Sequence, residues 1–164
     1  MEAFSGARRR WRALWAAFAV STLAACPAEP GSPEAQVRAL FARAETAAEQ
    51  KDAGALKDLV SEHYADDGGH DRQAIAGLLT FHFLRHQSIH LLTRVHAIGF
   101  PEPTRAQATI FVAMGGTPIL IVDDLARVRA DLYRFDFDLA DEADGDWRVT
   151  RAAWRRATRE DFLP

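Results

Sequence analysis

Hydrophobic positions along the chain follow two successive patterns. From about residue 34 to residue 86, apolar side chains recur every three or four positions, which predicts helices. After Gln87, apolar and polar side chains alternate, which predicts strands. Helices followed by a run of antiparallel strands are typical of an α+β domain, in which the helices cover one face of a curved sheet of about four strands.

Three helices are expected, each preceded by a residue that can cap its first turn. The first spans residues 34–51 and follows Ser32 and Pro33, and the second is a short helix after Asp52. The third spans residues 71–86 and starts at Asp71. Its predicted inward face consists of Ile75, Leu78, Leu79, His82, Phe83 and His86.

Four strands are expected at about residues 89–99, 106–114, 127–139 and 147–157. Pro101 and Pro103 should end the first strand. The third strand has a face that is mostly apolar and a charged face, formed by Asp131, Tyr133, Phe135, Phe137 and Leu139 and by Arg134, Asp136 and Asp138, respectively. Residues 119–122 fit neither pattern, and a short additional strand is one interpretation of them.

The N-terminus has the three parts of a signal peptide. A basic segment at residues 8–12 precedes an apolar run at residues 13–25, which is too short to span a bilayer as a helix. The run ends with Leu23-Ala24-Ala25-Cys26, which resembles the lipobox of bacterial lipoproteins. The resemblance implies that residues 1–25 are removed and that Cys26, the only cysteine of the chain, receives acyl chains such as palmitate.

This resemblance implies an address for the protein. Acylated Cys26 would anchor it to a membrane of the bacterial envelope, facing the periplasm. Pro27 stands where an Asp would signal retention in the inner membrane, which favours the outer membrane. Residues 26–33 form a short, proline-rich tether, in which Pro27 to Pro33 reach at most about 25 Å.

Composition and charge are those of a globular, non-nucleic-acid-binding domain. The chain is 48% hydrophobic and 26% charged, with a net charge of −3. Since the first 25 residues carry net positive charge, the remainder is more acidic than the whole. An acidic body lacks the basic face that binding of nucleic acid requires.

Two segments resemble the nuclear transport factor 2-like superfamily of cone-shaped α+β domains. The stretch AAEQKDAGALKDLVSEHYADDGG, residues 47–69, resembles its opening helices and loop. The stretch DLYRFDFDLADEADGDWRVTRAAWRRA, residues 131–157, resembles its closing hairpin. The resemblance covers residues 34–158 and leaves residues 159–164 as a tail. Because the superfamily contains both enzymes and non-enzymes, it does not assign a chemistry.

The sequence favours neither a metal nor a cofactor. His82 and His86 are one helical turn apart and could contact one ion, but a closed site needs three or four converging ligands. The phosphate-binding, dinucleotide-binding, metalloprotease and serine hydrolase motifs are absent from the chain. We therefore expect no bound metal and no cofactor.

The remaining candidate site is the hollow of the cone. Its candidate residues are Tyr64, His82, Asp131, Tyr133 and Phe135. The favoured interpretation is a non-catalytic domain that binds a small apolar molecule or a protein partner. The alternative is an isomerase, dehydratase or hydrolase that uses the Tyr, His and Asp side chains.

Trp147 and Trp154 bear on self-association. They lie seven residues apart, so a regular strand places them on opposite faces, and only a bulge would bring them to one face. An aromatic side chain that faces away from the core would leave apolar surface on the outer sheet face, which a second copy of the chain could cover. We therefore expect a homodimer through that face.

Overall fold

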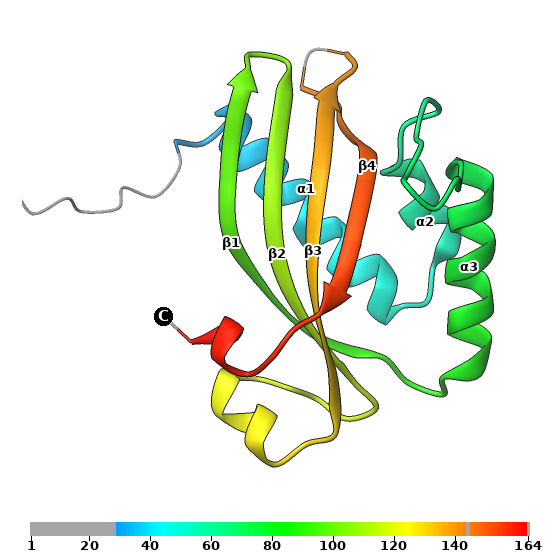
Figure 1. Ribbon diagram of the computed structural model, residues 1–164, viewed down its shortest axis with the longest axis vertical. Helices are drawn as coiled ribbons and strands as arrows, with labels where there is room; N and C mark the ends of the chain where they lie inside the picture. Colours follow the sequence, from blue (N-terminus) through cyan, green and yellow to red (C-terminus); the bar gives the residue numbers. More distant parts are fainter. Residues whose placement is uncertain (1–28, 144, 164) are drawn as a thin grey trace, which may run out of the picture.

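The computed structural model describes residues 29–143 and 145–163 (Figure 1). The signal segment, the lipobox and Cys26 lie outside these residues. The elements, in chain order, are α1 (Pro33–Glu49), α2 (Ala53–Asp58), α3 (Arg72–Arg85), β1 (His90–Glu102), β2 (Arg105–Gly115), the 3₁₀ helix η1 (Val122–Ala126), β3 (Ala130–Asp141), β4 (Trp147–Arg156) and the 3₁₀ helix η2 (Glu160–Phe162). No helix of the described part of the chain is long and apolar enough to cross a membrane.

Each predicted helix cap is present. The Ser32 hydroxyl accepts a hydrogen bond from the amide of Ala35 at 3.2 Å. The Asp52 and Asp71 carboxylates accept from the amides three residues further on, at 2.9 Å and 2.8 Å. These contacts satisfy amide groups that a helix cannot pair internally, so each helix begins where the sequence indicates.

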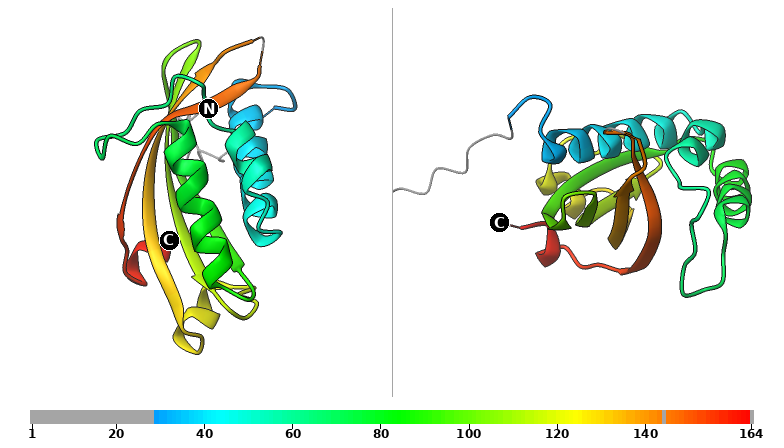
Figure 2. Two further views of the ribbon diagram at one scale, coloured as in Figure 1. Left: turned by 90° about the vertical axis from the view of Figure 1, so that its right-hand side faces the viewer. Right: turned by 90° about the horizontal axis from the view of Figure 1, so that it is seen from above.

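The sheet is antiparallel with the order β1-β2-β3-β4, and it curves around α1 (Figure 2). The predicted α+β fold with a four-stranded curved sheet is confirmed. We call the face toward α1 the concave face and the opposite one the outer face. Strand β1 runs through Pro101 to Glu102, further than expected. Strand β1 lies at the edge of the sheet, where Pro101, which has no amide hydrogen, need not break a hydrogen bond between strands.

Two hydrophobic clusters hold the sheet from both sides. The concave cluster joins α1 to the sheet through side chains such as Leu40, Ile110 and Trp147. The outer cluster contains Phe111, Leu125 and Phe162, and Phe162 is fully buried. Since all these elements and both clusters lie within residues 29–163, this part of the chain carries its own core.

The outer cluster accounts for two segments that the sequence left undefined. Residues 119–122 lead into η1 rather than forming a strand: Ile119 is buried, and Leu125 of η1 packs beside it. The last residues form η2, which lies against the sheet on the side away from α1 (Figure 2). The expected tail therefore covers part of the outer face.

A bulge in β4 places the two C-terminal tryptophans on one face. Leu139 pairs with Val149, but Asp138 pairs with Arg151, so Thr150 is the extra residue. Trp147 and Trp154 thereby lie opposite Asp141 and Phe135, which share the concave face. The argument for a homodimer depended on an outward-facing aromatic side chain, and Trp154 does not supply one.

Helix α3 lies beside the sheet (Figures 1 and 2). Lysine side chains outside the helix contact it near both of its ends. Near its start, the Lys57 ammonium group donates to Gln73 at 2.8 Å. Just after its end, the Lys51 ammonium group donates to the carbonyls of His86 and Gln87, each at 3.0 Å. The predicted inward face of this helix is only partly right, because Leu78 is 46% exposed and His86 lies beyond the last turn.

Candidate functional site

A row of aromatic side chains lines the concave face along β3. Tyr133, Phe135 and Phe137 follow one another at centroid distances of 6.1 Å and 5.6 Å, and the last two rings are stacked. The alternation of β3 turns all three toward the helices. Phe137 also contacts Phe41 of α1 at 5.2 Å, which fixes one end of the row.

The other end of this aromatic row is open. Tyr133 and Phe135 are only partly buried, and Trp154, opposite Phe135 on β4, is 48% exposed. Burying a large aromatic surface is strongly favourable, so an unfilled aromatic face is a ready binding surface. We call Tyr133, Phe135, Phe137 and Trp154 the aromatic floor.

Polar groups stand around the open end of the floor. The Asp131 carboxylate pairs with the Arg156 guanidinium at 2.5 Å, and that guanidinium lies 4.9 Å from the Tyr133 ring centre. From α3, the His82 Nε2 atom contacts the Met114 sulfur on β2 at 3.3 Å. Asp131 is opposite Met114 in the sheet, so His82 and Asp131, from distant parts of the chain, both lie beside Met114.

The surroundings of His82 favour its neutral form. Burial lowers the pKa of His82 below its ordinary value, and the adjacent His86, whose ring centre is 4.2 Å away, lowers it further. The negative charge of Asp131 acts in the opposite direction without reversing the shift. At pH 7 this imidazole is therefore uncharged and presents hydrogen-bonding nitrogen atoms rather than a cation.

Tyr64 takes a different place from the other four candidate residues. It is 4% exposed and belongs to the concave core cluster. Its hydroxyl donates to Asp66 at 3.3 Å, and Asp66 also accepts from the amide and the ring of His70. Burial, followed by the charge of Asp66, raises the pKa of Tyr64 to about 12. This tyrosine holds the loop between α2 and α3 rather than presenting a free hydroxyl.

The sequence analysis missed Glu45 of α1. It lies one helical turn beyond Phe41 and reaches Thr93 on the concave face. Burial raises the pKa of Glu45, an effect that the Thr93 hydroxyl opposes and that nearby Glu49 reinforces. A glutamate on the apolar side of an amphipathic helix is the sequence signal that could have indicated it.

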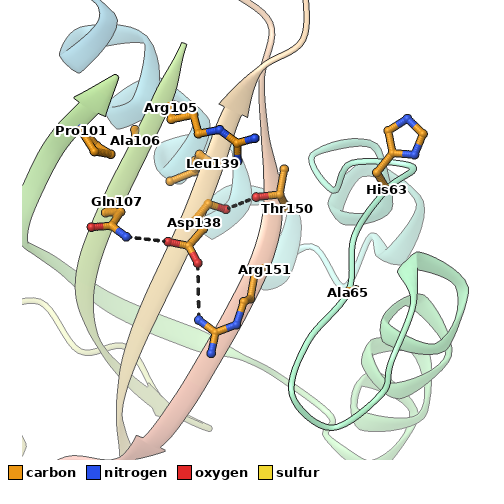
Figure 3. A pocket seen from close by; sticks show the side chains of 10 residues that line it. All are labelled: His63, Ala65, Pro101, Arg105, Ala106, Gln107, Asp138, Leu139, Thr150 and Arg151. Atoms are coloured by element: carbon orange, nitrogen blue, oxygen red, sulfur yellow. Dashed lines mark hydrogen bonds and ion pairs between the residues drawn. The ribbon is translucent and has the colours of Figure 1, made fainter. Parts of the chain in front are cut away.

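A hollow of about 430 Å³ lies at the bulge of β4 and is lined by none of the aromatic floor residues (Figure 3). Its lining includes His63, Arg105, Gln107, Asp138, Thr150 and Arg151. Asp138 accepts from Gln107 at 3.0 Å and from Arg151 at 3.4 Å, and Arg151 also binds Asp67 at 2.5 Å. Because these charges neutralise one another, the hollow offers little to a ligand, and the aromatic floor is the stronger candidate site.

The described residues contain no group of three or more His, Cys, Asp or Glu side chains arranged to hold a metal ion. His82 and His86 are neighbours, but the imidazole of His86 contacts the backbone carbonyl of His82 and lies against the His82 ring.

Comparisons with known proteins give the fold. No protein-family model matches the chain, and no curated protein matches it. Among solved structures, it is similar to a domain of unknown function with a cystatin-like fold from Nostoc punctiforme (TM-score 0.58, 17% identity, 79% of this chain and 82% of that one). It is also similar to a proposed scytalone dehydratase from Novosphingobium aromaticivorans (TM-score 0.62, 13% identity, 76% and 84%).

A third similar structure is a ketosteroid isomerase-like protein from Erwinia carotovora (TM-score 0.55, 13% identity, 76% and 95%). Identities this low establish architecture and leave chemistry open. The helices before the strands, the four-stranded curved antiparallel sheet and these structural neighbours together show that the chain has the nuclear transport factor 2-like cone fold.

Proposed function

We propose that this protein is a lipid-anchored domain of the bacterial envelope that binds a small, flat, largely apolar molecule on its aromatic floor. The observation that carries the binding function is the partial exposure of Tyr133 and Phe135 on the concave face, beside Trp154, which is 48% exposed. A flat ligand would remove these rings from water and stack on them.

The polar groups favour binding over catalysis. An acid–base enzyme needs a carboxylate and a base within reach of the same proton. Here Asp131 is engaged by Arg156, and the His82 Nε2 atom contacts the Met114 sulfur. These side chains can orient the polar edge of a ligand without a shared proton-transfer role.

The envelope location is proposed from the residues before the domain. The lipobox-like segment ending at Cys26 supports acylation, and the short stretch to α1 would keep the domain close to the membrane surface. A ligand delivered from or to a membrane would be mainly apolar, in keeping with the aromatic floor.

Nuclear magnetic resonance on residues 27–164 tests the binding function with 2-naphthylmethanol, a neutral two-ring probe. We expect the amides of Tyr133 and Phe135 and the Trp154 indole to shift on titration. Phe135→Ala should weaken binding about fivefold, since an aromatic contact contributes about 1 kcal/mol. Leu120→Ala removes a more exposed apolar side chain elsewhere and should leave the affinity unchanged.

Two results would contradict the proposal. One is the absence of any shift at millimolar probe. The other is a set of shifts confined to Gln107, Thr150 and Arg151, which would place the site in the hollow at the bulge of β4.

A further inference from the structure

We propose that the ligand of the aromatic floor carries an amine, and that Glu45 binds its positively charged nitrogen. This inference rests on the proposed binding function and names the class of ligand. The carboxylate of Glu45 is the group that distinguishes an amine from other polar head groups.

Glu45 is placed to meet such a ligand. Its contact residue Thr93 pairs with Val112 on β2, and Val112 pairs with Tyr133 on β3. Two strand spacings of about 4.8 Å separate Thr93 from Tyr133, so the carboxylate stands roughly 10 Å across the concave face from the aromatic floor. A two-ring body with a one-carbon arm can bridge this span.

The charge of Glu45 is not neutralised by a cation in the described part of the chain. None of the ion pairs formed by these residues includes it. The charge that acts on its pKa is that of Glu49, which is also negative. A half-buried carboxylate beside a second one attracts a cation, because binding offsets the cost of its desolvation.

The other polar groups of the site do not favour an anionic ligand. Arg156 is already paired with Asp131 at 2.5 Å and lies over the Tyr133 ring. His82 is neutral because it is desolvated. The exposed Trp154 side chain adds a further attraction, since the face of an aromatic ring is electron-rich and favours cations.

Three probes with one ring system test the inference: 2-naphthylmethylamine, 2-naphthylmethanol and 2-naphthoate. Calorimetry on residues 27–164 at pH 7 should show that the amine binds at least fivefold more tightly than the alcohol, and that the carboxylate binds most weakly. Glu45→Gln should abolish the advantage of the amine while leaving the affinity for the alcohol unchanged. Glu34→Gln, on the same helix but at its exposed start, should retain the advantage.

The outcomes separate this inference from the proposed function. If the amine and the alcohol bind equally well, or if Glu45→Gln keeps the preference, the amine inference is wrong and the binding function stands. If the carboxylate binds best, Arg156 rather than Glu45 selects the ligand, and the inference is also wrong. If none of the three probes binds, the proposed function fails.

Discussion

Trp147 and Trp154 lie on the same face of β4 but in opposite environments. Trp147 is 2% exposed, donates its indole hydrogen to Gln36 at 3.0 Å and meets the ring of Phe100 edge-on. Trp154, past the bulge at Thr150, is 48% exposed beside Phe135. The first tryptophan closes the core and the second extends the aromatic floor.

This difference predicts unequal effects of the same substitution. Trp147→Ala should lower the free energy of unfolding by about 3–5 kcal/mol, because it leaves a large cavity. Trp154→Ala should lower it by about 1 kcal/mol or less, since much of that side chain is already in water. Urea unfolding of residues 27–164 measures both. Similar losses for the two variants would show that Trp154 is part of the core.

Phe162 predicts a role for the C-terminal segment. Its ring is fully buried 5.7 Å from that of Phe111, and its carbonyl accepts from Arg94. Phe162→Ala should cost about 3–5 kcal/mol of stability. Deleting residues 159–164 should in addition expose Phe111 and increase self-association through the outer face.

Light scattering at tens of micromolar measures this self-association, with residues 27–164 as the control. The same control tests the proposed homodimer directly. A shortened chain that associates no more than the control would show that the uncovered apolar surface does not pair.

Asp66 predicts a dependence of stability on acid. The amide of His70, which donates at 2.9 Å, and then the His70 ring lower the pKa of Asp66 below its ordinary value. A carboxylate with a lowered pKa stabilises the fold above its unfolded value of about 3.9, and this contribution is lost as pH falls through the folded value. Asp66→Asn should therefore destabilise the protein at pH 7 and progressively less below pH 4.

Urea midpoints at pH 7, 4 and 3 for the wild type and Asp66→Asn give this comparison. A difference between the two proteins that does not shrink below pH 4 would mean that the ionised carboxylate is not what stabilises the loop.

Cys26 predicts the attachment to the membrane. Wild-type protein expressed with residues 1–25 should appear in the membrane fraction, with a mass increased by acyl chains on Cys26. Cys26→Ser should lose both the added mass and the attachment. Intact-mass spectrometry and fractionation provide the measurements, and an unmodified wild-type Cys26 would rule out the lipid anchor.

The sequence was most informative where the causes are local. Capping by Ser32, Asp52 and Asp71 and the alternation along β3 depend on residues close in the chain, so the helix starts and the face of Tyr133 and Phe135 could be predicted. The fold class followed from the order of these elements.

Features that depend on distant contacts could not be predicted in the same way. Residues 119–122 and Phe162 are buried by the outer face of the sheet, which only the assembled fold creates. The bulge at Thr150 decides the face of Trp154, although the spacing of the tryptophans posed the question correctly. Glu45 is half-buried where α1 meets the sheet, and its partner Thr93 is 48 residues further along the chain.

The lysine contacts at the ends of α3 determine how this helix responds to amine-modifying reagents. Lys51 and Lys57 are the only lysines of the chain, against eighteen arginines, and each holds one end of this helix. A reagent that acylates amines would therefore leave almost every other cation intact and remove both attachments at once. Amine acylation would thus selectively weaken the attachment of α3, whose start Arg72 still holds through Glu62 and the carbonyl of Lys57.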